Sequence, residues 1–221
     1  MRLAKPRLLL ALLATALLPA CDSTALRPEP YSENSFRRWL AEEDGRQARF
    51  DRFEAFLAEM RVADVVPAWQ LLRTDAKYAA RCGIVPFQLP AEEKWPAIVP
   101  TLRLVREHVI PVVGPVEVVA SDRDDKLNDC VNGAGRSKHL AFAAVDLVAP
   151  GRPDKPQLFA DLCAMHQRVG AKSGMGLGAY FDPYKPVASA QGRFHIDRAG
   201  FRTWGFSFTR ASSYCVTMRD A

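Results

Sequence analysis

The sequence predicts an α+β fold in which helices come first and a small, mainly antiparallel sheet with one crossing helix follows. Two observations support this prediction. Residues 35–110 carry apolar side chains at helical spacing, and from residue 111 onward short apolar runs of strand length alternate with turn residues. The chain has 221 residues, of which 48% are hydrophobic and 25% charged, a composition typical of one globular domain with a buried core.

The first half divides into helices at serine, glycine and proline positions. Ser35 is expected to cap a first helix, and Gly45 separates this helix from a second. A third helix is expected over residues 67–80 and a fourth over residues 97–109, where Pro100 fits the first turn. We expect these helices to pack on the same core as the sheet and not to form a second domain.

The second half contains five runs with strand character and one helix. The run that contains Asp146 is apolar enough to be buried on both faces. The glycine-rich run over residues 174–180 is not a dinucleotide-binding fingerprint. Such a motif requires a strand before it and a helix after it, and both are missing here. The strand-like runs are residues 115–121, 140–149, 174–180, 193–200 and 201–208, and the helix spans residues 156–169.

The N-terminus has the pattern of a secretory signal. Arg2, Lys5 and Arg7 precede an apolar run over residues 8–18, which small residues follow. This run is too short for a spanning helix. We therefore expect residues 1–20 to be a signal peptide.

Cys21 follows the predicted signal directly, and the sequence LPAC resembles a bacterial lipobox, in which the cysteine becomes the lipid-bearing N-terminus. The alternative is ordinary signal cleavage with a spare cysteine. Residues 21–34 are polar and contain two prolines, which suits a tether between a membrane and the domain. We expect a membrane-anchored lipoprotein of the bacterial cell envelope that faces the periplasm, with the choice between inner and outer membrane open.

The formal net charge of +5 arises largely from the predicted signal. The whole chain has 30 Lys and Arg against 25 Asp and Glu. Three of the basic residues lie in residues 1–20, so 27 basic and 25 acidic residues remain, a net charge of +2. No basic stripe is present, and nucleic-acid binding is not expected.

Four cysteines remain after Cys21, and an even number in an exported chain favours two disulfides. Three pairings are possible, and the sequence does not choose among them. None of these residues stands in a CxxC motif, so a structural zinc knot is not expected. The four are Cys82, Cys130, Cys163 and Cys215.

Two pairs of polar residues interrupt strand-like sequence. His139 and Asp146 flank an apolar run, and a carboxylate is rarely buried without a partner. His195 and Asp197 alternate along a second run, which places both side chains on one face of a strand. The partner of the buried carboxylate is either a basic side chain in a salt bridge or a metal ion. Catalytic zinc sites typically take three protein ligands, such as histidine and aspartate, and leave a fourth position for water.

The run SDRDDKLNDCVNGAGRSKHLAFAAVDL (residues 121–147) resembles the signature of the D-alanyl-D-alanine carboxypeptidase and dipeptidase group of zinc peptidases, which share a fold with the hedgehog signalling domain. The resemblance covers about residues 110–205. Matches occur in order along the group pattern. They are Ser121, Arg123, Asn128, Gly133, Gly135, Ser137, His139, Ala144, Asp146, Gly176, Gly178, Tyr180 and the run 194–197.

The resemblance implies a zinc ion held by His139, Asp146 and His195. Asp197 is then the expected general base, or the partner that orients a histidine ligand. An inverted assignment, with Asp197 on the metal and His195 as base, stays open. Arg123 is expected to bind a substrate carboxylate or a developing oxyanion; the alternative is a surface arginine.

Two further residues are expected to bind substrate. Ser137 is expected to hydrogen-bond near the substrate, although a turn cap is an equal alternative. Tyr180 is expected to line the cleft, and the alternative is a position in the core. The same two alternatives apply to Trp204. His108 and His166 occur in helical patterns beside charged residues, and we expect both to face solvent.

The chain departs from the group pattern at three places. Phe142 stands where the motif has glycine, so the surroundings of the metal would have to accommodate a large ring. Asp122 replaces the usual glycine before the arginine. Residues 190–194 contain no acid, although several members carry their general base shortly before the last histidine.

The function that these features imply is a zinc-dependent peptidase that acts on peptidoglycan stem peptides or their cross-links, as a carboxypeptidase or an endopeptidase. The first alternative is a non-catalytic peptidoglycan-binding lipoprotein of the same fold. The second is a structural envelope protein in which both His/Asp pairs are salt bridges.

Overall fold

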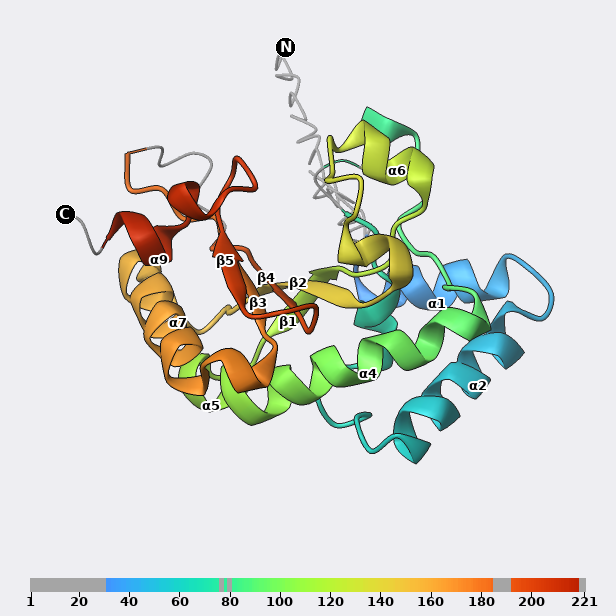
Figure 1. Cartoon of the computed structure of the whole chain (residues 1–221). Coiled ribbons are helices and arrows are strands. Elements are labelled where there is room, and N and C mark those ends of the chain that lie inside the picture. Colours follow the sequence, from blue (N-terminus) through green and yellow to red (C-terminus); the bar gives the residue numbers. More distant parts are fainter. Residues whose placement is uncertain (1–30, 76–77, 79–80, 185–191, 219–221) are drawn as a thin grey trace, which may run out of the picture.

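The computed structural model describes residues 31–75, 78, 81–184 and 192–218. The predicted signal peptide, Cys21 and most of the predicted tether lie outside these residues. The fold is α+β, as predicted: helices surround a small, open, five-stranded sheet (Figure 1). Within the described part of the chain, every helix is too short or too polar to cross a membrane.

The elements have the following bounds. The α-helices are α1 (Glu33–Ala41), α2 (Arg46–Glu59), α4 (Trp95–Leu104), α5 (Ile110–Val113), α6 (Asp125–Cys130), α7 (Lys155–Val169) and α9 (Tyr214–Thr217). The short helical turns are η1 (Ala68–Leu72), η2 (Glu92–Lys94), η3 (Val105–Val109), η4 (Lys138–Ala141), η5 (Ala171–Ser173) and η6 (Arg210–Ser212). The strands are β1 (Glu117–Ala120), β2 (Ala144–Val148), β3 (Gly176–Ala179), β4 (Phe194–Asp197) and β5 (Arg202–Trp204).

The strand order in the sheet is β1-β2-β4-β3-β5. Three of the four pairings are antiparallel, and only the pairing of β3 with β5 is parallel. The sheet is therefore mainly antiparallel, as predicted. Helix α7 connects β2 to β3 and is the expected crossing helix, and Figure 1 shows α4 and α5 running along one side of the sheet.

One hydrophobic core joins the early helices to the sheet. Phe53 of α2 is fully buried between Trp95 of α4 and Phe142, at ring-centroid distances of 5.1 and 6.0 Å. Phe142 directly precedes the segment that leads into β2. Because the buried side chains of both halves form one cluster, the helical half supports the strands that carry the polar residues described below.

Helix α1 begins earlier than the sequence indicates. Its N-cap is Ser32, whose hydroxyl accepts a hydrogen bond from the Ser35 backbone N–H at 3.2 Å. The predicted cap Ser35 is thus the third residue of the helix.

Two other helices differ from their predicted bounds. Helix α4 starts at Trp95, so Pro96 takes the first-turn position and Pro100 lies inside the helix, where it removes one backbone hydrogen bond. The helix predicted over residues 67–80 is interrupted: η1 forms, residues 73 and 74 then pair with residues 86 and 87, and the described residues Tyr78, Arg81 and Cys82 are helical again. At the interruption, the Thr74 N–H donates to the Pro86 carbonyl at 2.9 Å.

The expected two disulfides are present, and the structure resolves their pairing as Cys82–Cys130 and Cys163–Cys215. The first links the end of α6 to the segment near residue 82. The second links α7 to α9. Both bonds close loops of about fifty residues, 48 and 52, and so restrict the unfolded chain.

Candidate metal centre

The pairing of β2 with β4 brings two of the predicted metal ligands together. Asp146 lies directly opposite His195 in this antiparallel pair, and Ala144 lies opposite Asp197. Directly opposed side chains share one face of a sheet and are close neighbours. His195 and Asp197 also share this face, and Nε2 of His195 lies 2.9 Å from Oδ2 of Asp197, as the strand alternation predicts.

His139 reaches the same point from outside the sheet. The sequence suggested strand structure here, but His139 lies in the 3₁₀ turn η4, which ends at Phe142 in a left-handed conformation (φ 51°). The turn reverses the chain before β2 begins. Two contacts with the preceding segment fix it: Nδ1 of His139 contacts the Ser121 carbonyl, and the Arg123 N–H donates to the His139 carbonyl at 3.1 Å.

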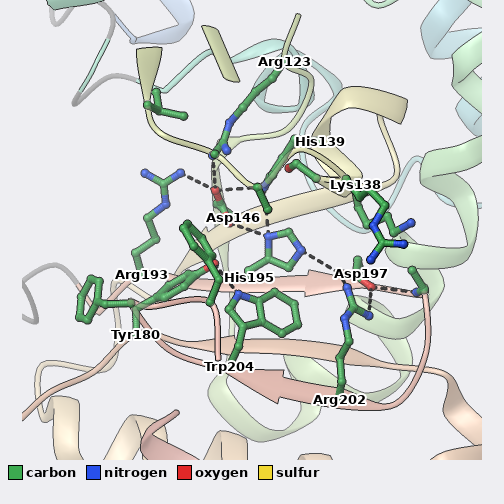
Figure 2. A pocket seen from close by; sticks show the side chains of 18 of the residues that line it. Arg123, Lys138, His139, Asp146, Tyr180, Arg193, His195, Asp197, Arg202 and Trp204 are labelled. Atoms are coloured by element: carbon green, nitrogen blue, oxygen red, sulfur yellow. Dashed lines mark hydrogen bonds and ion pairs between the residues drawn. The ribbon is translucent and has the colours of Figure 1, made fainter. Parts of the chain in front are cut away.

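His139, Asp146 and His195 form one buried group whose ligand atoms all lie within 4.8 Å of one another. Nε2 of His139 is 3.0 Å from Nδ1 of His195 and 3.2 Å from Oδ2 of Asp146. Nδ1 of His195 is 3.0 Å from Oδ1 of Asp146. Figure 2 shows the two rings and the carboxylate pointing toward one another.

The hydrogen bond made by the outer nitrogen of each ring determines the tautomer of that ring. A backbone carbonyl only accepts hydrogen bonds, so Nδ1 of His139 carries a proton and donates it to Ser121. By the same reasoning, Nε2 of His195 donates to the Asp197 carboxylate. In their neutral forms both rings therefore direct a lone pair inward, beside the Asp146 carboxylate. Three electron-pair donors that converge in a buried space need a cation, either a proton or a metal ion.

The environment sets the charge state of each member of the group. Burial lowers the pKa of His139 to about 4, so this ring is neutral at pH 7. Burial alone would raise the pKa of Asp146, but the charge of Arg193 and the hydrogen bond with His195 outweigh it and hold the pKa well below its usual range. Burial would lower the pKa of His195, but the hydrogen bonds to Asp146 and Asp197 outweigh it and raise the pKa.

Asp197 anchors His195 on the side away from the other two ligands. Its carboxylate accepts hydrogen bonds from His195, from both terminal nitrogens of Arg202 at 2.9 and 2.6 Å, and from the Ala199 N–H at 2.8 Å. Burial would raise its pKa, but the bonds from His195 and Arg202 lower it. With its oxygens so engaged, Asp197 fits the role of orienting partner better than that of general base or ligand.

Two glycines of β3 leave the space that this arrangement needs. Gly176 lies opposite Asp197 and Gly178 opposite His195. A Cβ atom at Gly176 would lie 2.7 Å from Oδ1 of Asp197, and one at Gly178 would lie 2.8 Å from both Cβ of His195 and Oη of Tyr180. The glycines of the motif therefore allow close side-chain approach across the strand pair.

The buried group opens into a pocket of about 920 Å³. All predicted site residues of the folded domain line this pocket: Arg123, Ser137, His139, Asp146, Tyr180, His195 and Asp197. Trp204 also lines it, and its ring nitrogen donates to Oη of Tyr180 at 3.1 Å. The Tyr180 hydroxyl thus keeps its own proton available for donation, and burial raises its pKa further above the usual range. The Ser137 hydroxyl makes no cap hydrogen bond to η4.

Phe142 does not obstruct the pocket. Its side chain is fully buried and packs against Phe53 in the core, and it is not among the residues that line the pocket. The left-handed backbone at this position is the physical reason for glycine in the motif. Here the contact of the ring with the core offsets the strain of φ 51° in a residue with a side chain.

His166 is buried, and the prediction that it faces solvent is wrong. It is 4% exposed, its Nε2 contacts the Met175 carbonyl at 3.0 Å, and its ring stacks on Phe201. A neutral histidine can be buried when an acceptor satisfies its N–H, and this acceptor comes from the segment before β3. His108 is half-buried.

Arg193 and Asp75 line the pocket beside Asp146 and were not predicted from the sequence. Arg193 precedes β4 and contacts both Asp146 and Asp75, at 2.7 Å in the latter case. The alternation that places His195 and Asp197 on one face places Arg193 there too, so the strand pattern contained this information. Asp75 lies in the helical half, is 2% exposed and carries no local pattern that points to the pocket.

Comparison of the chain with protein-family models, with curated proteins and with solved structures finds no match. The fold and the site together define the protein as an α+β domain with a buried His139–Asp146–His195 group that could hold a metal ion. Two imidazole nitrogens and one carboxylate, with fixed tautomers and a partner for each outer nitrogen, fit such an ion.

Proposed function

We propose that this protein is a zinc-dependent peptidase that hydrolyses peptide bonds in peptidoglycan stem peptides or their cross-links. The observation that carries the proposal is the convergence of His139, Asp146 and His195 in a pocket wall, with the lone pairs of both rings directed inward by Ser121 and Asp197. Two histidines and one carboxylate with an open side match the ligand number of catalytic zinc sites.

Zinc, when bound, supplies Lewis acidity that polarises a carbonyl and acidifies a water molecule. The overall reaction adds one water across the C–N bond and yields a carboxylic acid and an amine. The residues of the chain position the peptide for this reaction. Arg123 stabilises negative charge that develops on the carbonyl oxygen, and the Tyr180 hydroxyl donates a hydrogen bond to the peptide.

The expected substrate follows from compartment and resemblance together. The two disulfides are consistent with an oxidising compartment. The resemblance to D-alanyl-D-alanine carboxypeptidases and dipeptidases points to peptides with D-amino acids and free carboxylates. A lipid on Cys21 would place the domain at a membrane of the bacterial envelope, in reach of peptidoglycan.

A non-catalytic peptidoglycan-binding lipoprotein is the second candidate, and one observation favours it. Of the described residues that line the pocket, the carboxylates are Asp75, Asp146 and Asp197, and each is already engaged by an arginine. A carboxylate held in this way is a weak proton acceptor. In this alternative, the pocket binds stem peptides without cleaving them.

Digestion of purified muropeptides tests the proposal. The mature chain, loaded with zinc, is incubated with monomeric and cross-linked muropeptides, and the products are analysed by mass spectrometry. We expect loss of a terminal D-alanine or opening of a cross-link, abolished by a chelator and by His139→Ala. His108→Ala serves as the matched control, because His108 does not line the pocket. Intact muropeptides together with measurable binding would establish the non-catalytic alternative.

A further inference from the structure

Arg193 connects the predicted ligand group to the helical half of the domain. Its Nη2 atom lies 2.7 Å from Oδ2 of Asp75 and also contacts Oδ2 of Asp146. Arg123 contacts the same two oxygens, at 3.7 Å and 3.1 Å. Figure 2 shows both guanidinium groups directed at Asp146 from one side of the pocket.

The two arginines and two aspartates balance in charge. A cation held by His139, Asp146 and His195 would add positive charge beside this cluster and would share the carboxylate of Asp146. Asp75 would then be the one carboxylate left for two guanidinium groups. The wall of the pocket next to the ligand group would carry excess positive charge, and an anionic group of a ligand would restore the balance.

Unused hydrogen-bond donors support this reading. Arg123 is 8% exposed, and its buried Nε has no hydrogen-bond partner. Such a buried, unsatisfied donor is rare in folded proteins and costs stability. The contacts of Arg193 with Asp75 and Asp146 run through Nη2, and its planar fork carries further N–H groups that can bind a ligand.

We propose that Arg193, held in place by Asp75, binds the free α-carboxylate of the residue that leaves when the peptide bond is cleaved. This inference rests on the proposed peptidase function and names the residue that determines substrate specificity. Arg193 contacts a predicted metal ligand directly, so an anion that it binds lies beside the reacting carbonyl. The paired geometry of guanidinium and carboxylate favours a carboxylate in this position.

The inference restricts the substrate class. A C-terminal residue carries a free carboxylate on the carbon that bears the leaving amine. A cross-link to a diamino acid whose amine-bearing carbon also carries a free carboxylate meets the same requirement. A peptide bond in the middle of an ordinary chain does not, because its next carbonyl is an amide. The protein would therefore cleave the first two kinds of bond and spare the third.

Binding of two small probes to the zinc-loaded mature chain tests this inference. N-acetyl-D-alanine carries the carboxylate, and N-acetyl-D-alaninamide lacks it. By calorimetric titration we expect the wild type to prefer the acid roughly 10-fold or more, the order of one charge-assisted interaction. In Arg193→Gln the preference should fall to within about threefold. Arg198→Gln, an exposed arginine outside the pocket, is the control and should behave as wild type.

Arg193→Lys covers the case in which the glutamine variant does not fold. It keeps the charge balance with Asp75 and Asp146 but loses the planar fork, and its acid preference should lie between those of wild type and Arg193→Gln. An acid preference that persists unchanged in the folded Arg193 variants would overturn the inference, since the metal alone would then account for it. Equal binding of both probes by the wild type would overturn it as well.

Hydrolysis of a longer pair separates this inference from the proposed function. The substrates are an acetylated L-Lys-D-Ala-D-Ala tripeptide and its C-terminal amide. Cleavage of acid and amide at equal rates would support the peptidase function and contradict the role of Arg193. Absence of cleavage together with Arg193-dependent binding of the carboxylate probe would contradict the peptidase function and leave Arg193 as the carboxylate-binding residue of a non-catalytic protein.

Discussion

Nε2 of His139 lies 3.0 Å from Nδ1 of His195, although the outer nitrogen of each ring already donates its proton to an acceptor. Neutral rings in this arrangement would place two lone pairs against each other inside the protein. The arrangement is stable only with a cation between the rings and Asp146. Without a metal ion, a proton on His195 can supply this charge, because Asp146 and Asp197 raise the pKa of its ring against the opposing effect of burial.

A metal ion at this position should stabilise the folded state. Zinc at about 100 times its dissociation constant adds about 2.7 kcal/mol to the free energy of unfolding, which raises the Tm of a domain of this size by roughly 5–10 °C. We expect this increase in thermal unfolding experiments with zinc, and its loss in His139→Ala. His108→Ala should keep it. An equal increase in wild type and His139→Ala would show that zinc binds elsewhere.

Asp197→Asn should weaken metal binding without abolishing it. The asparagine oxygen can still accept the proton of Nε2 of His195, but the charge that fixes the ring and pairs with Arg202 is lost. Such partners of a ligand contribute roughly 10–100-fold in metal affinity. The measurement is competition with a fluorescent zinc chelator, and Asp161→Asn on α7, outside the pocket, is the control.

The same variant decides between the two ligand assignments. A loss of zinc as complete as in Asp146→Asn would mean that Asp197 is itself a ligand, as in the inverted assignment with His195 as base. A partial loss is the result expected from the geometry, in which Asp197 contacts His195 on the side away from Asp146.

Gly178→Ala should destabilise the domain. The new Cβ would lie 2.8 Å from Cβ of His195 and from Cζ and Oη of Tyr180, and such overpacking in a buried site costs about 1–3 kcal/mol. Gly135→Ala is the matched control, because a Cβ there meets nothing within 4 Å and the residue also lines the pocket. Urea unfolding of both variants measures the difference. If Gly178→Ala unfolds at the same urea concentration as Gly135→Ala, the close approach across β3 and β4 is not required.

The parts of the site that depend on local periodicity could be predicted from the sequence. Strand alternation placed His195 and Asp197 on one face, and the apolar run around Asp146 indicated a buried strand that needs a partner for its carboxylate. The pairing of His139 with Asp146 made His139 a candidate ligand, and the resemblance then assigned it to the site. Its 3₁₀ turn could not be predicted, since the turn depends on contacts of η4 with Ser121 and Arg123 that no local pattern shows.

The parts that depend on tertiary contacts could not be predicted. Asp75 reaches the pocket only because the chain after η1 pairs with residues 85–88, which holds this segment near Arg193. The disulfide pairing likewise depends on how α7 and α9 pack. His166 was misassigned for the same reason, since its acceptor, the Met175 carbonyl, is supplied by another element.

His166→Gln provides a test of buried histidine that is independent of any metal. Burial lowers the pKa of His166, so the folded protein holds this ring neutral. A histidine with a lowered folded pKa contributes stability that is present above its unfolded pKa of about 6.5 and is lost as the pH falls below that value.

Glutamine keeps an N–H for the Met175 carbonyl but does not titrate. Wild type should be the more stable protein at pH 7, and its advantage over His166→Gln should shrink steadily between pH 7 and pH 5. Urea unfolding of the chelator-treated proteins across this range measures the difference. Other titrating groups, His139 and His195 included, are common to both proteins and cancel in the comparison, so an advantage that stays constant or grows toward pH 5 would mean that His166 accepts a proton in the folded state without cost.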